Sequence, residues 1–136
     1  MDFLKSLSIA ASGLRAQAGR MRVIAENIAN ADSTAKTPGG EPYRRKIPTF
    51  QSEIDRTLDA RVVAFGRVKP DQSDFQLKYQ PGHPAADASG NVKYPNVNAL
   101  IEMTDMREAQ RSYEANINVV SATRRMIQRT IEILKA

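Results

Sequence analysis

The side chain best suited to metal binding or catalysis in this chain is that of its single histidine. His83 lies between Gly82 and Pro84, and the sequence contains no cysteine. A structural zinc site needs several His or Cys ligands, so His83 lacks the companions that a metal site requires. A Ser/His/Asp mechanism would depend on this one histidine in a predicted loop. We therefore predict neither a metal site nor a catalytic site at His83.

A second group of candidates lies in the last third of the chain, where acidic and basic residues alternate at helical spacing. The carboxylates are Glu102, Asp105, Glu108 and Glu114, and the nearby cations are Arg107 and Arg111. Spacings of three and four residues favour solvated ion pairs on a helix face over acid–base catalysis. The Thr37–Gly40 turn lacks the Gly-Lys-Ser/Thr ending of a phosphate loop. We predict a non-enzyme without a cofactor.

Arg44, Arg45 and Lys46 form the densest basic run. We interpret it as a solvated strand edge or loop, with an anionic partner such as nucleic acid, phospholipid or a cell-wall polymer as the alternative. The net charge of +5 is spread over residues 1–30, 31–96 and 97–136 as +2, +2 and +1. A nucleic-acid footprint is normally concentrated on one element. A basic coiled-coil protein that binds nucleic acid therefore remains the second hypothesis, and a peripheral membrane protein is the third.

The element that must position these residues is the last forty residues, 97–136, which contain neither Pro nor Gly. A 3-4 spacing of mostly apolar residues predicts a coiled-coil-like helix, about 57 Å long from residue 97 to residue 134 at roughly 1.5 Å per residue. Asn96 or Asn98 is its expected N-cap. The expected a row is Met103, Gln110, Ile117, Arg124 and Ile131, and the expected d row is Met106, Tyr113, Val120, Ile127 and Leu134. A seam of this length needs a partner.

Residues 2–30 form a second predicted helix, with Asp2 as its N-cap. It also has two rows with heptad spacing, Leu7, Leu14, Met21 and Ile28 in one and Leu4, Ala11, Ala18 and Ala25 in the other. Residues 31–96 contain all seven Pro and five of the seven Gly, so they cannot hold a long helix. We expect a short helix over 50–58 and strands over 61–69 and 75–79 joined by a turn at 70–74. Residues 81–91 are expected to be a loop.

Several motifs, in order along the chain, resemble one family. Residues 26–34 resemble the signature that follows the first helix of bacterial flagellar rod and hook proteins. The longer segment 37–46 resembles the proximal-rod members of that family, and residues 81–98 and 102–116 are similar to its later signatures. Asn91 departs from this pattern, in which an aromatic residue is expected, and residues 50–80 match only loosely.

The resemblance implies a mainly α protein with a small β insert. Its terminal helices, 1–30 and 97–136, would pair as an antiparallel coiled-coil-like hairpin in one discontinuous domain, with residues 31–96 as a β/loop insert. The implied function is that of a structural subunit of the flagellar proximal rod, part of the torque-transmitting shaft. Implied partners are other rod subunits, copies of itself and the flagellar type III export apparatus, close to peptidoglycan. The implied location is the basal body where the rod crosses the periplasm, reached without a cleaved signal peptide.

The expected helix-pairing and assembly residues come from both ends of the chain. They are Leu4, Leu7, Leu14, Met21, Asn27, Ile28, Asn30, Met103, Met106, Gln110, Tyr113, Asn116, Ile117, Val120, Arg124, Ile127, Ile131 and Leu134. The basic run Arg44, Arg45 and Lys46 is the expected outer contact. Gln110 and Arg124 are the polar members of the seam, and we expect them to face neighbouring subunits.

Overall fold

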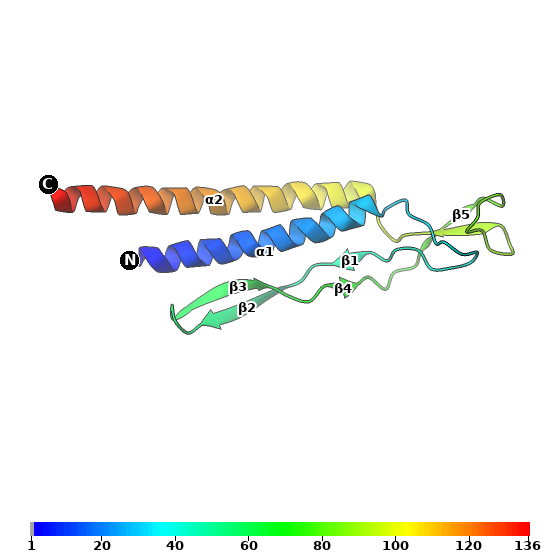
Figure 1. Cartoon of the computed structure of the whole chain (residues 1–136), viewed down its shortest axis with the longest axis horizontal. Coiled ribbons are helices and arrows are strands. Elements are labelled where there is room, and N and C mark those ends of the chain that lie inside the picture. Colours follow the sequence, from blue (N-terminus) through cyan, green and yellow to red (C-terminus); the bar gives the residue numbers. More distant parts are fainter. Residues whose placement is uncertain (1) are drawn as a thin grey trace. The chain divides into compact units, whose positions relative to one another are not determined.

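The computed structural model describes residues 2–136, which contain two long helices and six short strands. The elements are α1 (Phe3–Ala29), β1 (Lys46–Ile47), β2 (Phe50–Asp55), β3 (Ala60–Phe65), β4 (Lys69–Pro70), β5 (Gln76–Tyr79), β6 (Asn91–Tyr94) and α2 (Ala99–Lys135) (Figure 1). The predicted fold class, mainly helical with a small β region, is confirmed. None of the described helices is long and apolar enough to cross a membrane.

The chain forms two compact units, and both long helices contribute to each. The first unit contains α1 up to Met21, residues 48–67 and α2 from Arg107 onward; the second contains residues 22–47 and 68–106. Each unit therefore combines helix ends with strands from the middle of the sequence.

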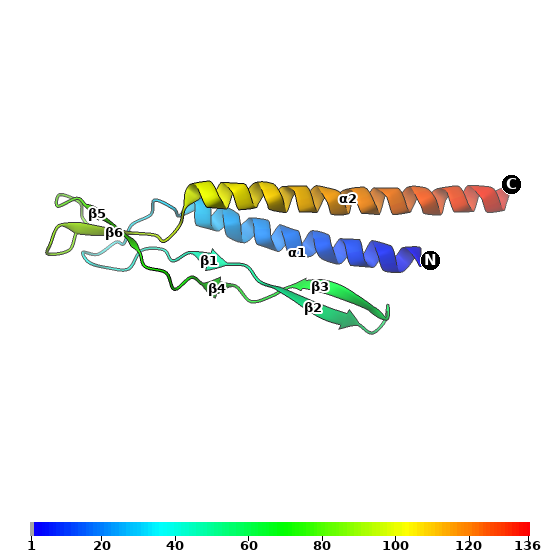
Figure 2. The ribbon, with the colours of Figure 1, turned by 180° about the vertical axis from the view of Figure 1, so that it is seen from behind.

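In the first unit, α1 lies between α2 and the β2–β3 hairpin (Figures 1 and 2). On one side, a Cβ added to Gly13 would lie 3.0 Å from the amide of Asn116. On the hairpin side, the Ser12 hydroxyl accepts a hydrogen bond of 3.3 Å from the Val63 backbone N–H. Arg20 forms an ion pair with Glu108 at 3.6 Å, so a later residue of α1 lies beside an earlier residue of α2 than in the Gly13–Asn116 contact. The two helices are therefore antiparallel, as predicted.

Gly19 fixes how closely the hairpin approaches α1. A Cβ at this position would lie 2.8 Å from two ring carbons of Phe65. We expect Gly19→Val to destabilise the protein by about 1–3 kcal/mol, because overpacking forces the ring or the backbone to move. Urea unfolding measures the effect. Gly82→Ala is the control, since a Cβ there meets nothing within 4 Å, and an equal loss in both variants would contradict the prediction.

The helix starts are capped by side chains, as the sequence predicts. The Asp2 carboxylate accepts hydrogen bonds from Leu4 N (3.0 Å) and Lys5 N (3.2 Å). Of the two candidates at the second helix, Asn98 is the cap, accepting from Leu100 N at 3.1 Å and Ile101 N at 3.4 Å. These bonds satisfy backbone N–H groups that have no partner within the helix.

Removing the second cap should weaken the start of α2. We expect Asn98→Ala to cost about 1 kcal/mol, since it leaves these N–H groups without a side-chain acceptor. The reduction should appear in urea unfolding and as faster amide exchange at Leu100 and Ile101. Asn98→Asp keeps the acceptor and should retain most of the stability. A loss in the Asp variant as large as that in the Ala variant would rule out capping as the cause.

The second unit packs the last turns of α1 and the first turns of α2 with two small sheets. In these sheets β1 pairs with β4 and β5 pairs with β6, each antiparallel. Ile24 is 2% exposed and Val92 is fully buried. The predicted strand over 75–79 is confirmed as β5, and the predicted loop 81–91 connects it to β6.

Two predictions for the middle region are wrong. Residues 50–58 do not form a short helix, because β2 pairs with β3 in register from Phe50↔Phe65 to Asp55↔Ala60. The Asp55 carboxylate accepts from Thr57 N and Leu58 N, and Asp59 has a φ of 46°, so a tight turn forms where a helix would continue. Residues 70–74 also do not join two paired strands, since β3 pairs with β2 and β5 with β6.

Candidate assembly interface

A buried polar network holds the two helices together in the second unit, and Asn27 is at its centre. The Asn27 amide donates to Lys46 O (2.8 Å) and to a Glu102 carboxylate oxygen (3.1 Å). Its carbonyl oxygen accepts from the Tyr43 hydroxyl (2.8 Å) and from Lys46 N (2.9 Å). Asn27 is fully buried, and these four bonds use both donors and both acceptor positions of the amide. Through Glu102, Asn27 therefore connects α1 with α2 inside the second unit.

Glu102 and Arg45 form the charged part of this network. Arg45 Nε donates to Glu102 at 2.6 Å, and a second guanidinium nitrogen lies 3.3 Å from an Asp71 oxygen. Burial by itself lowers the pKa of Arg45, but hydrogen bonds and charge from Glu102, and then from Asp71, raise it above its ordinary value. Glu102 is 1% exposed, so its expected role in a solvated helix-face pair was wrong. The buried carboxylate instead pairs with a cation from the middle segment.

The pKa values of three further groups around Asn27 and Arg45 favour the protonation states that this hydrogen-bond network needs. Burial raises the pKa of the Tyr43 hydroxyl, which stays neutral and donates to Asn27. Hydrogen bonds from Ser73, first its backbone and then its side chain, lower the pKa of Asp71, and burial opposes them. The hydrogen bond to Glu26 raises the pKa of Lys46. At neutral pH each group is therefore in the protonation state that its hydrogen bonds require.

The basic run is folded into the chain more than the sequence suggested. The Arg44 guanidinium lies 4.2 Å from the centre of the Phe75 ring and donates to the carbonyl oxygens of Asp71 and Ser73. Lys46 pairs with Glu26 at 2.9 Å, and its side chain is 42% exposed. The sequence analysis predicted a solvated strand edge or loop for this run. Its side chains instead form intrachain contacts, and residues 43–46 contact both helices and the 71–75 segment.

The row of α2 residues that is buried within the chain is shifted by one position from the predicted a row. The buried positions Glu102, Ala109 and Thr123 are 1%, 0% and 3% exposed, and half-buried Asn116 completes their seven-residue spacing. The predicted d positions Met106, Tyr113, Val120 and Ile127 are half-buried beside this row. The predicted a row, Met103, Gln110, Ile117, Arg124 and Ile131, is exposed, as is Leu134. The intrachain seam therefore uses small and polar residues, and the bulky row faces outward.

The physical reason lies in the part of α1 in the first unit, whose buried residues are small. Ala10 and Ala16 are buried at 4% and 2%, and Gly13 faces Asn116. Such residues bring the helix backbones close, and Ala109 fits the narrow space better than Met103 or Ile117 would. The predicted Leu7, Leu14, Met21 and Ile28 are half-buried, whereas Leu4 is 68% exposed. Asn30, another expected interface residue, donates to Glu26 O at the end of its own helix.

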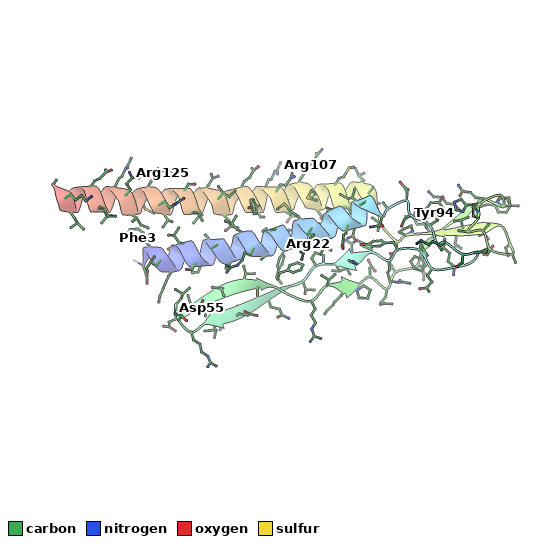
Figure 3. All side chains as sticks on the ribbon, viewed as in Figure 1. Phe3, Arg22, Asp55, Tyr94, Arg107 and Arg125 are labelled. Atoms are coloured by element: carbon green, nitrogen blue, oxygen red, sulfur yellow. The ribbon has the colours of Figure 1, made fainter. Side chains whose placement is uncertain are left out.

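α2 extends beyond the start of α1 in the first unit. Gly13 lies against Asn116, so an antiparallel pair places Phe3 near Met126, and the following turns of α2 have no described helix opposite them. Ile131, Ile133 and Leu134 are 47%, 75% and 81% exposed. Arg107 and Arg125, in contrast, point away from α1 on the outer side of α2 (Figure 3). Three large apolar side chains are therefore exposed at this end of α2.

A groove runs along this end of α2. It has a volume of about 460 Å³ and is lined by Leu7, Arg124, Ile127, Gln128, Ile131, Glu132 and Lys135. Arg124 is exposed and forms no ion pair within residues 2–136. Within the same residues no cluster of His, Cys, Asp and Glu is suited to hold a metal ion. The groove is therefore lined by three apolar side chains together with four polar or charged ones.

In comparisons with known proteins, the chain is similar to flagellar basal-body rod proteins. Residues 7–35 match the model of the flagella basal body rod protein family, and residues 88–133 match that of the flagellar basal body rod FlgEFG protein C-terminal family. The chain is 53% identical to the flagellar basal-body rod protein FlgC of Agrobacterium fabrum, over 100% of this chain and 99% of the relative. It is 40% identical to the protein of that name from Bacillus subtilis, covering 99% and 100% of the two chains. The corresponding Salmonella typhimurium protein is 41% identical, with 98% of each chain covered.

Proposed function

Because the chain belongs to the FlgC family of flagellar basal-body rod proteins, it is a structural subunit of the rod rather than an enzyme, and we propose that it joins neighbouring axial subunits through the outward faces of α2. The observation that carries this proposal is the exposure of bulky apolar residues along a helix whose intrachain seam is already filled. Ile117 and Ile131 are 41% and 47% exposed, while the small residue Ala109 is fully buried. These exposed rows would be buried when the subunit assembles.

The finer proposal is a place in the proximal rod, where the subunit would transmit torque along the shaft. Residues 31–96 would lie outside the helical pair, contact other subunits and lie close to peptidoglycan. The Lys46 side chain is 42% exposed, against 22% for that of Arg45, and is available for such an outer contact. This part of the proposal depends on the resemblance of segment 37–46 to the proximal-rod proteins. Membership of the rod family leaves the nucleic-acid alternative without support.

We also propose that the chain crosses the inner membrane through the flagellar type III export apparatus and assembles where the rod crosses the periplasm, without losing a signal peptide. This follows from the similarity of its terminal motifs to those of exported axial proteins. Mass spectrometry of the protein recovered from purified basal bodies is the measurement. Its N-terminus should be Met1 or Asp2, and an N-terminus many residues further along would contradict the proposal.

The rod assignment itself is tested by deletion and complementation. A strain that lacks the gene should form neither hooks nor filaments and should not swim, and the wild-type chain supplied in trans should restore all three. Purified hook–basal bodies from the complemented strain should contain the chain. A deletion strain that still builds hooks and swims would refute the assignment.

A further inference from the structure

A cavity within the second unit has a lining that is mostly cationic. It lies between the last turns of α1 and the β1–β4 pair and has a volume of about 680 Å³. Its charged residues are Arg22 and Glu26 of α1, Arg44, and Lys46 of β1. Three cations are accompanied by one carboxylate, so the lining carries a net charge of +2.

Two of the three cations have no carboxylate partner within residues 2–136. Arg22 is exposed and forms no ion pair, and it lies on the side of α1 toward β1 and β4 (Figure 3). Arg44 forms no ion pair either, because its guanidinium donates to the backbone carbonyl oxygens of Asp71 and Ser73. These carbonyl groups carry no net charge, so the positive charges of both arginines remain available to an anion from outside the chain.

The third cation and the single carboxylate of the lining are paired with each other, but solvent reaches both. Lys46 Nζ lies 2.9 Å from a Glu26 oxygen, and the two side chains are 42% and 48% exposed. Ion pairs with this exposure contribute little to stability. Lys46 can therefore exchange Glu26 for an incoming carboxylate at a small cost.

The uncharged part of the lining is apolar. Val23 is buried at 3% exposure, whereas Val68 is 40% exposed and Pro70 is also exposed, and the Tyr43 ring completes this part. A bare inorganic anion would leave the exposed apolar surface in contact with water, whereas a carboxylate carried beside an apolar group would cover it. The volume of the cavity lies within the range of about 300–1,000 Å³ that is typical of sites for such larger ligands.

We propose that this cavity, the cationic pocket, binds an acidic peptide segment of another axial protein, with an Asp or Glu carboxylate at Arg22 and Lys46 and a neighbouring apolar side chain against Val68. Arginine clusters recognise acidic motifs through charge-assisted hydrogen bonds of this kind. The inference rests on the proposed function for the source of the segment, since a rod subunit meets other axial proteins. A peptide suits the pocket better than a cell-wall glycan does, because the hydroxyl groups of a glycan match the apolar wall poorly.

NMR titration of the purified full-length chain tests the pocket with a short synthetic peptide of alternating leucine and glutamate, blocked at both ends. We expect the amide signals of Arg22, Lys46 and Val68 to shift, and the affinity to fall as salt screens the charges. A matched peptide with glutamine in place of every glutamate should bind at least about tenfold more weakly, because it lacks the charge that the pocket recognises.

Arg22→Gln should weaken binding of the leucine–glutamate peptide by about three- to tenfold, the effect of losing one partly exposed charge-assisted contact. Arg107→Gln is the matched control, since it removes the same charge from an exposed position on the outer side of α2 and should bind as the wild type does (Figure 3). Thermal unfolding of both variants verifies that they are folded.

Four results would overturn the proposal. The glutamate and glutamine peptides could bind equally well, or no amide of the pocket could shift at millimolar peptide. Inorganic phosphate could shift the same amides with equal affinity, which would make the pocket a simple anion site. A soluble peptidoglycan fragment could bind more tightly than the peptide, which would assign the pocket to the cell wall. Because the titration involves no rod, any of these failures leaves the rod assignment standing, and the deletion strain tests that assignment separately.

Discussion

Replacing Glu102 with alanine should destabilise the second unit by about 3 kcal/mol or more, because it breaks a buried ion pair and leaves its partners without an acceptor. Glu102 is 1% exposed and accepts from Arg45 at 2.6 Å and from the Asn27 amide at 3.1 Å. The Arg45 side chain is 22% exposed and, in the variant, keeps its contact with Asp71. The expected loss of unfolding free energy therefore lies toward the lower end of the range for broken buried ion pairs. Typical domains have only about 5–15 kcal/mol of stability, so this loss is large.

The measurement is urea unfolding combined with amide exchange resolved along the chain. Exchange should accelerate most in residues 22–47 and 68–106, which form the second unit. Glu108→Ala is the matched control: its ion pair with Arg20 is longer, at 3.6 Å, and its side chain is 68% exposed, so the expected cost is below about 1 kcal/mol. Glu102→Gln keeps an acceptor and should lie between the two. If both alanine variants unfold at the same urea concentration, the network does not stabilise the unit as described.

Ile117→Asp should abolish rod assembly while leaving the free subunit nearly as stable as before. Ile117 is 41% exposed in the single chain, and exposed substitutions usually change stability by less than about 0.5–1 kcal/mol. In the proposed contact the same position is buried against a neighbour, where an unpaired carboxylate costs several kcal/mol. A deletion strain that expresses the Ile117→Asp variant should not swim, and its hook–basal bodies should lack the variant protein.

Asn118→Asp is the matched control, since it adds the same charge one residue further along α2 at an exposed position outside the row that contains Ile117 and Ile131. It should restore swimming to near the wild-type level. Thermal unfolding of both purified variants separates a loss of assembly from a loss of folding. Normal swimming with Ile117→Asp would remove this flank of α2 from the interface, and equal defects in both variants would point to a nonspecific charge effect.

The sequence by itself determined the helices, the cap of the first helix and the family, and it narrowed the second cap to Asn96 or Asn98. Asp2 and Asn98 are polar residues at the ends of long segments without proline, and their side chains cap α1 and α2 through local contacts. Hydrophobic periodicity indicated two helices, and the change in Pro and Gly content marked the middle region. The family signatures in segments 26–34 and 37–46 also follow from residue identity alone. All these features depend on residues close together in the chain.

Only the tertiary structure decided which helix face is the seam and which strands pair. A heptad pattern indicates that apolar rows need covering, but it does not say whether the chain's own α1 or another subunit covers them. The close approach permitted by Ala10, Gly13 and Ala16 selects the narrow row of Ala109 and Thr123. The bulkier row with Ile117 is thereby left on the outside. Likewise, the Glu102 carboxylate is buried because Arg45, 57 residues away in sequence, is brought to it by the folded middle segment. Contacts over such separations depend on how the whole chain packs, and no local pattern of residues specifies them.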